Sequence, residues 1–179
     1  MVMYIPLPIP AWEYGEMAVK RIVKIAFLSA ILTLAMLAIK PLPNVELISL
    51  LVIIYALLFG KDSFIIVTVF SLVEGLFWGF GLWWFSYLYV WPLLCLIVLL
   101  LKRIIKEEFL IWAVVSGFFG LIFGTLFAIV YVPIDPAYAL SYWIAGLPWD
   151  AWHALWNFIL MAVLGKPIYR VLKKVSEAS

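Results

Sequence analysis

Long apolar runs alternate along the chain with short polar interruptions. A helix that crosses a membrane needs roughly 17 to 25 predominantly apolar residues, and six runs meet or approach this length. Glycine and charged residues mark the interruptions, such as GKDS at residues 60–63 and KRIIKEE at residues 102–108. The pattern predicts membrane-spanning helices over residues 20–39, 46–60, 63–82, 84–101, 109–132 and 148–165.

The segments outside these runs differ in character. Residues 1–19 include YIPLPIP, which cannot be helical through its prolines because each Pro removes a hydrogen-bond donor, so we expect an interfacial N-terminal segment. The first sixteen residues contain no Lys or Arg, which argues against a cleaved signal peptide. Residues 132–148 are the one long connection, and residues 166–179 are predicted to form a cytoplasmic tail that is a short basic helix or frays. We expect a single domain over residues 1–179.

Composition and charge support the interpretation of these runs as membrane spans. Apolar residues make up 68% and charged residues 12% of the chain, against about 25% charged residues in soluble domains. The sequence therefore predicts an all-α integral membrane protein, multi-pass, in a bacterial-type plasma membrane. With both termini in the cytoplasm, every Lys and Arg except Lys40 falls on the inner side, as the positive-inside rule requires. The net charge of +2 gives no reason to expect a nucleic-acid partner, and a single cysteine excludes an internal disulfide.

Small residues recur on two of the predicted helices. On residues 109–132 a stripe of them lines one face, and such stripes usually allow close packing between helices in a membrane. AFLSA, in the first helix, places Ala26 and Ala30 one turn apart. Internal packing and a docking face for another membrane protein both remain open for this pair.

Polar and aromatic side chains gather at one predicted depth, in the outer half of the bundle. Asp150, His153 and Asn157 share one face of the last helix, and Glu74 and Trp78 share a face of the third. Charged groups at this depth are costly and usually face cavities. The pattern predicts an outward-facing pocket for a small molecule, with rings that stack on a planar ligand. The predicted ligand-binding residues are Asn44, Glu74, Trp78, Trp84, Tyr87, Trp91, Tyr138, Tyr142, Trp149, Asp150, His153 and Asn157.

Other interpretations of these residues stand beside this one. Asp150 has the position of a cap at the third residue of a helix that begins with Pro148. His153 and Asn157 are also suited to hydrogen bonds between helices, and the tryptophans to an aromatic belt at the membrane surface. No H-E-x-x-H, G-x-S-x-G or P-loop motif is present, so we expect no catalysis and no ATP site. The alternative is an intramembrane enzyme that acts on a lipid or isoprenoid through Asp150 and His153.

The sequence resembles a known family over nearly its whole length: the substrate-binding S components of energy-coupling factor (ECF) vitamin transporters. The resemblance rests on six short spans, on AFLSA, on KPLPNVELISLLVIIYALLFGK and on GLPWDAWHALWNFILMAVLGKPIYRVLKK. Ala26 and Ala30 match the A-x-x-x-A motif of that family.

The resemblance implies that the protein binds a substrate and catalyses no reaction. An S component binds a vitamin or related micronutrient at the extracellular face, beneath loops that here correspond to residues 40–45, 79–84 and 133–147. It then associates through A-x-x-x-A with a transmembrane T component and two cytoplasmic ATPases, which use the ATP. No cofactor or metal is implied for this chain, and its sequence does not name the vitamin.

Overall fold

The computed structural model describes residues 11–177, and in this part of the chain the regular structure is entirely helical. The predicted all-α class is therefore confirmed for the described residues. In chain order the elements are α1 (Ala11–Ile39), α2 (Ile48–Phe59), α3 (Asp62–Trp78), α4 (Leu82–Ile105), α5 (Phe109–Ala128), a 3-10 turn (Ile129–Tyr131) and α6 (Pro136–Glu177).

Within the described part of the chain, four helices are long and apolar enough to cross a membrane: Gly15–Ile39, Leu82–Ile105, Phe109–Tyr131 and Pro136–Glu177. Their outward faces carry large exposed apolar side chains, such as Phe27, Leu100 and Phe118, whose contact with water is unfavourable. These features are those of a helical membrane protein.

The short helix α2 forms the centre of the bundle. Nine of its twelve residues are buried, from Ile48 to Ala56, and α1, α3, α4, α5 and α6 all contact it. A helix that is apolar all round is suited to such a position, because every face meets another helix. The core is therefore formed around α2, the shortest of the described α-helices.

The small-residue stripe of α5 packs against α6. A Cβ added at Gly117 would lie 3.2 Å from the carbonyl oxygen of Ala154, and one at Gly120 would lie 3.0 Å from the Ala154 Cα. Side chains at these positions would push the two backbones apart, so the predicted packing role of the stripe is confirmed. This close contact fixes the position of α6 beside the site described below.

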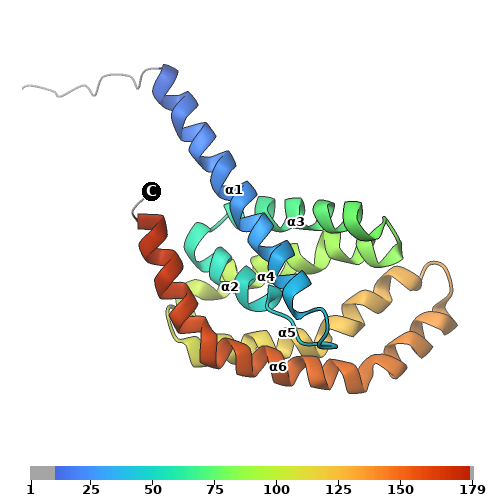
Figure 1. The fold of residues 1–179 in the computed structure, drawn as a ribbon. Coiled ribbons are helices and arrows are strands. Elements are labelled where there is room, and N and C mark those ends of the chain that lie inside the picture. Colours follow the sequence, from blue (N-terminus) through green and yellow to red (C-terminus); the bar gives the residue numbers. More distant parts are fainter. Residues whose placement is uncertain (1–10, 178–179) are drawn as a thin grey trace, which may run out of the picture.

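The final helix corrects the predicted connection at residues 132–148. Only a short turn separates the 3-10 segment from α6, which begins at Pro136 and continues for 42 residues through Pro148 and Pro167 (Figure 1). A proline inside a membrane helix is tolerated where neighbouring groups satisfy the freed carbonyl. Asp150 consequently lies in the middle of a helix, and the interpretation of this residue as a helix cap is wrong.

The N-terminal end of the described chain also differs from expectation. Helix α1 begins at Ala11, so the second half of the predicted interfacial segment is part of the first helix, while the proline run at residues 4–10 lies outside the described residues. At the C-terminal end, the described residues match the helical alternative for the tail, because α6 continues to Glu177.

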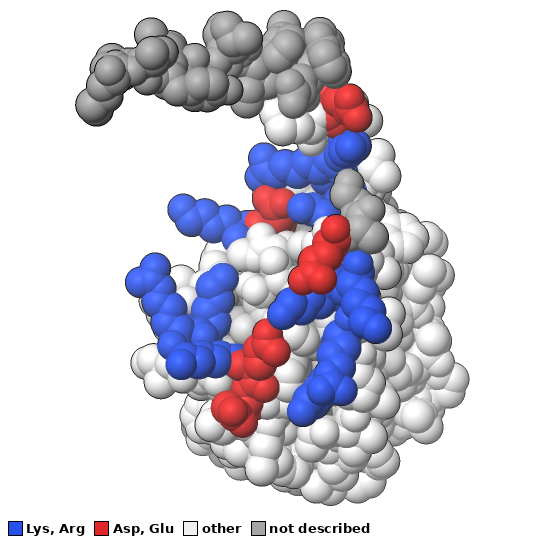
Figure 2. Space-filling view, turned by 90° about the vertical axis from the view of Figure 1, so that its left-hand side faces the viewer, with Lys and Arg blue, Asp and Glu red and all other residues white. Residues whose placement is uncertain are grey.

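Basic side chains gather at one end of the bundle. Figure 2 shows Lys and Arg on the face that carries the start of α1, the α2–α3 and α4–α5 turns and the end of α6. Asp62 at the start of α3 pairs there with Arg21 at 2.8 Å and with Lys24 at 3.2 Å. The opposite ends of the helices, beyond which Lys40 lies, surround the candidate site.

Candidate functional site

A cavity of about 740 Å³ lies at the end of the bundle away from the basic face. It is bounded by the end of α1, by residues 40–46, by the start of α2 and by parts of α3, α4, α5 and α6. Its walls combine aromatic rings with a few polar groups, which is the usual composition of a site for a small molecule.

Eight of the twelve predicted ligand-binding residues line this cavity. They come from the 40–46 segment and from α3, α4 and α6, so residues more than a hundred positions apart meet at one hollow. The eight residues are Asn44, Trp78, Tyr87, Trp91, Tyr142, Trp149, Asp150 and His153.

Trp84 does not line the cavity. Its indole Nε1 donates a hydrogen bond of 2.8 Å to the Ser71 carbonyl oxygen, and its ring packs edge-on against Phe80. The neighbouring Trp83 lines the cavity instead and contacts Tyr87, four residues later. The predicted stripe therefore begins one residue earlier than expected, because a spacing of four residues keeps Trp83, Tyr87 and Trp91 on one face of α4.

Tyr138 and Asn157 also lie outside the cavity lining. Tyr138 is 52% exposed and contacts the rings of Tyr131 and Tyr142 beside the α5–α6 turn. Asn157 is buried and donates a hydrogen bond of 3.2 Å to Ser49 Oγ, which joins α6 to α2. The alternative interpretation of Asn157, as a hydrogen bond between helices, matches this contact.

Glu74 is fully buried one turn before Trp78, and it does not reach the cavity lining. Neither of its carboxylate oxygens has a hydrogen-bond partner among the described residues. A buried acid without a hydrogen-bond partner is costly in a membrane.

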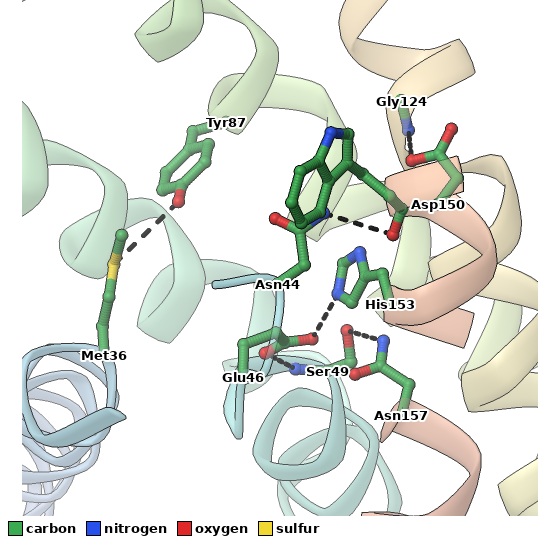
Figure 3. Close-up of polar contacts among 10 residues, drawn as sticks. Met36, Asn44, Glu46, Ser49, Tyr87, Gly124, Asp150, His153 and Asn157 are labelled. Carbon is green, nitrogen blue, oxygen red and sulfur yellow. Dashed lines mark hydrogen bonds and ion pairs between the residues drawn. The ribbon is translucent and has the colours of Figure 1, made fainter. Parts of the chain in front are cut away.

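The cavity floor holds a chain of polar contacts around Glu46. One carboxylate oxygen of Glu46 lies 3.3 Å from His153 Nε2, and the other accepts a hydrogen bond of 2.8 Å from the Ser49 backbone N–H (Figure 3). The acid thereby caps the start of α2 and orients the imidazole of α6 at the same time. Asn157 continues the chain to Ser49.

Asp150 is held separately, against α5. Its Oδ1 accepts a hydrogen bond of 3.0 Å from the Gly124 backbone N–H, and its Oδ2 has no partner among the described residues (Figure 3). A Cβ at position 124 would meet both carboxylate oxygens, so only glycine leaves room for this contact. Asp150 and His153 share a face of α6 but make no hydrogen bond to each other.

Aromatic rings form one wall of the cavity. Tyr87 and Trp91 of α4 pack edge-on, Phe123 and Phe127 of α5 stack, and the Phe123 ring also meets His153. Such a wall offers ring faces and edges to a flat ligand.

The rim closes over these rings. Asn44 donates a hydrogen bond of 3.2 Å to the Trp149 carbonyl oxygen, which ties the 40–46 segment to α6. The Lys40 ammonium lies 3.2 Å from the centre of the Trp78 ring, a cation–π contact that joins the end of α1 to the end of α3.

Several lining residues were not among the predicted site residues. Trp83 carries a signal in the sequence, since it lies four residues before Tyr87. Glu46 was expected on this side of the membrane, but its contact with His153 depends on how the chain folds back. The others that the prediction missed include Met36, Lys40, Phe123, Gly124 and Phe127.

The cavity is suited to non-covalent binding. The described residues contain no group of three or more His, Cys, Asp or Glu side chains placed to hold a metal ion. What the lining offers is ring surface, an imidazole, an ammonium group, an amide and two carboxylates, and the polar groups would orient a ligand by hydrogen bonds. No protein-family model, curated protein or solved structure matches this chain.

On the outside of α1, Ala26 and Ala30 are both exposed, whereas Ile25, Leu28 and Ser29 face the bundle. The internal-packing interpretation of this pair is therefore wrong for the single chain. The two alanines form a flat patch on the surface of the molecule.

Proposed function

We propose that this chain is the substrate-binding S component of an ECF-type importer, which captures a vitamin or related micronutrient at the extracellular face. The observation that carries the proposal is the cavity itself, a volume of about 740 Å³ in which Asp150, His153 and eight aromatic residues meet. The resemblance in the sequence names the family, and a hollow of this composition at the predicted depth supports it.

The proposal includes six membrane-embedded helices with both termini in the cytoplasm. The clustering of Lys and Arg at one end of the bundle supports this orientation (Figure 2). At a rise of 1.5 Å per residue, α2 is only about 18 Å long, shorter than a hydrocarbon core of about 30 Å. Because the surrounding helices bury it, its ends need not reach the lipid headgroups.

Access to the cavity would be controlled by residues 40–45 and by the α3–α4 turn. The contacts of Asn44 with Trp149 and of Lys40 with Trp78 hold the first of these segments over the cavity. The third proposed gate, at residues 133–147, is mostly helix, so it would move as the first turns of α6 rather than as a loop.

A direct test is mass spectrometry of the small molecule that remains bound to the purified protein, followed by a titration of intrinsic tryptophan fluorescence. We expect one ligand per chain and quenching on binding, with weaker binding in His153→Ala and Asp150→Ala, because both side chains line the cavity. Ser141→Ala, on the exposed side of α6, serves as the control. Absence of any retained ligand, together with turnover of a lipid substrate, would favour the intramembrane enzyme instead.

The patch at Ala26 and Ala30 would receive the T component, which in turn binds the two ATPases. Ala26→Leu should abolish uptake in cells that supply these partners and should leave ligand binding intact. The matched control is Ala162→Leu, which adds the same bulk to an exposed position of α6. If uptake survives Ala26→Leu, the docking surface lies elsewhere.

A further inference from the structure

A second hollow, of about 370 Å³, opens on the basic face of the bundle. It lies where the ends of α2 and α4 meet α6. Its lining consists of Leu57, Lys102, Arg103, Lys106, Glu107 and Tyr169, and we call it the basic pocket.

The cations of the basic pocket have no carboxylate partners among the described residues. Lys102, Arg103 and Lys106 form no ion pair, whereas Arg21 and Lys24 elsewhere on this face both pair with Asp62. The positive-inside rule and the helix dipole explain why basic residues occur at this end of α4. Neither explains why three of them line one hollow without forming an ion pair with any described residue.

The one acid in the basic pocket is already engaged. Glu107 accepts a hydrogen bond of 2.8 Å from the Tyr169 hydroxyl and pairs with Lys173 at 3.1 Å. These two contacts hold the pKa of Glu107 below its ordinary value. Lys173 balances the acid, so the pocket keeps an excess of positive charge from α4.

We propose that the basic pocket binds a phosphate group, as presented by the headgroup of an anionic phospholipid in the adjacent leaflet. The guanidinium of Arg103 provides a planar fork for two phosphate oxygens, and the ammonium groups of Lys102 and Lys106 add point charges. Basic pockets between membrane helices commonly receive such headgroups. Leu57 supplies an apolar surface for the glycerol and the first acyl carbons.

The test is native mass spectrometry of the full-length, delipidated protein with added dioleoyl-phosphatidylglycerol or dioleoyl-phosphatidylcholine. The pocket variant carries Lys102→Gln, Arg103→Gln and Lys106→Gln. The control carries Lys166→Gln, Arg170→Gln and Lys174→Gln, an equal loss of charge on the same face but outside the pocket lining. We expect the pocket variant to lose phosphatidylglycerol affinity by roughly tenfold or more relative to the control.

A second arm separates the two sources of phosphate. Inorganic phosphate is titrated against chloride at equal ionic strength while thermal unfolding is followed in the same variants. Thermal stabilisation by phosphate, with no preference for phosphatidylglycerol over phosphatidylcholine, identifies the free anion as the ligand. A preference for phosphatidylglycerol, with no stabilisation by phosphate, identifies the lipid. Equal losses in the two triple variants, or no response in either arm, overturn the proposal.

If the triple variant fails to fold, Arg103→Gln and Arg170→Gln give the same comparison one residue at a time. The outcome is independent of vitamin capture, because the two cavities share no lining residue.

Discussion

Nε2 of His153 lies 3.3 Å from Oε1 of Glu46, so the middle of α6 contacts the residue that caps α2. This pair forms the floor of the large cavity, and it links the two helices that define its depth. Because Glu46 is also bonded to the Ser49 N–H, the imidazole meets an acid whose position is already fixed.

The first prediction concerns this pair. Glu46→Gln and His153→Ala should each destabilise the protein, and together they should show a coupling energy of about 0.5–3 kcal/mol in a double-mutant cycle. The measurement is unfolding in a mixed-micelle titration. Thr68→Ala, on the exposed face of α3, is the control, and its effect on stability should add to that of either variant. A coupling energy of the same size in these control pairs would contradict a specific contact between Glu46 and His153.

The second prediction concerns the space at Gly124. A Cβ there would meet the Asp150 carboxylate, with Oδ1 only 2.6 Å away, so Gly124→Ala should destabilise the protein by about 1–3 kcal/mol. Gly146→Ala, with nothing within 4 Å of its new Cβ, should be neutral or stabilising. Adding Asp150→Ala should relieve part of the Gly124→Ala defect; an unchanged defect would place the clash elsewhere.

The third prediction concerns pH. The pKa of Asp62 is lowered: partial burial opposes this shift, but hydrogen bonds from Arg21 and Lys24 outweigh it. A lowered pKa adds stability above the ordinary value of 3.8, and this stability is lost as the pH falls below that value.

The stability difference between the wild type and Asp62→Asn should therefore be constant near neutral pH and shrink below about pH 4. Thermal unfolding between pH 7 and pH 3 measures it. Glu16→Gln removes an exposed pair with Lys20 and should have little effect at any pH. A difference that grows as the pH falls would reverse the predicted sign.

The fourth prediction compares two serines. Ser29 is buried and donates to the Ile66 carbonyl oxygen of α3 at 3.0 Å, in addition to a bond within its own helix. Ser141 is exposed and bonds only within α6. Ser29→Ala should therefore cost about 0.6 kcal/mol, the average for a hydrogen bond between membrane helices, and Ser141→Ala should cost less. Equal costs would show that the bond to Ile66 adds nothing.

Much of the fold was predictable because membrane helices are recognised in a sequence by their length and apolar composition. The spacing of Asp150 and His153 also placed both residues on the cavity wall, since a helix keeps residues three apart on one side. The spacing could not show that α6 runs through Pro148. That outcome depends on neighbouring groups rather than on the proline itself.

The remaining errors arise from contacts between segments that are distant in the sequence. Trp84 turns to the Ser71 carbonyl oxygen, and this acceptor is evident only once α3 lies beside α4. Glu46 reaches His153 because the 40–46 segment folds over the bundle, a path that no local pattern encodes.

Because α6 is one helix of 42 residues, it carries His153 at the large cavity and Tyr169 at the basic pocket. These residues are about 24 Å apart along the axis at 1.5 Å per residue. The two hollows are therefore built on one continuous helix, and Pro167 is the only proline of α6 that lies between these two residues.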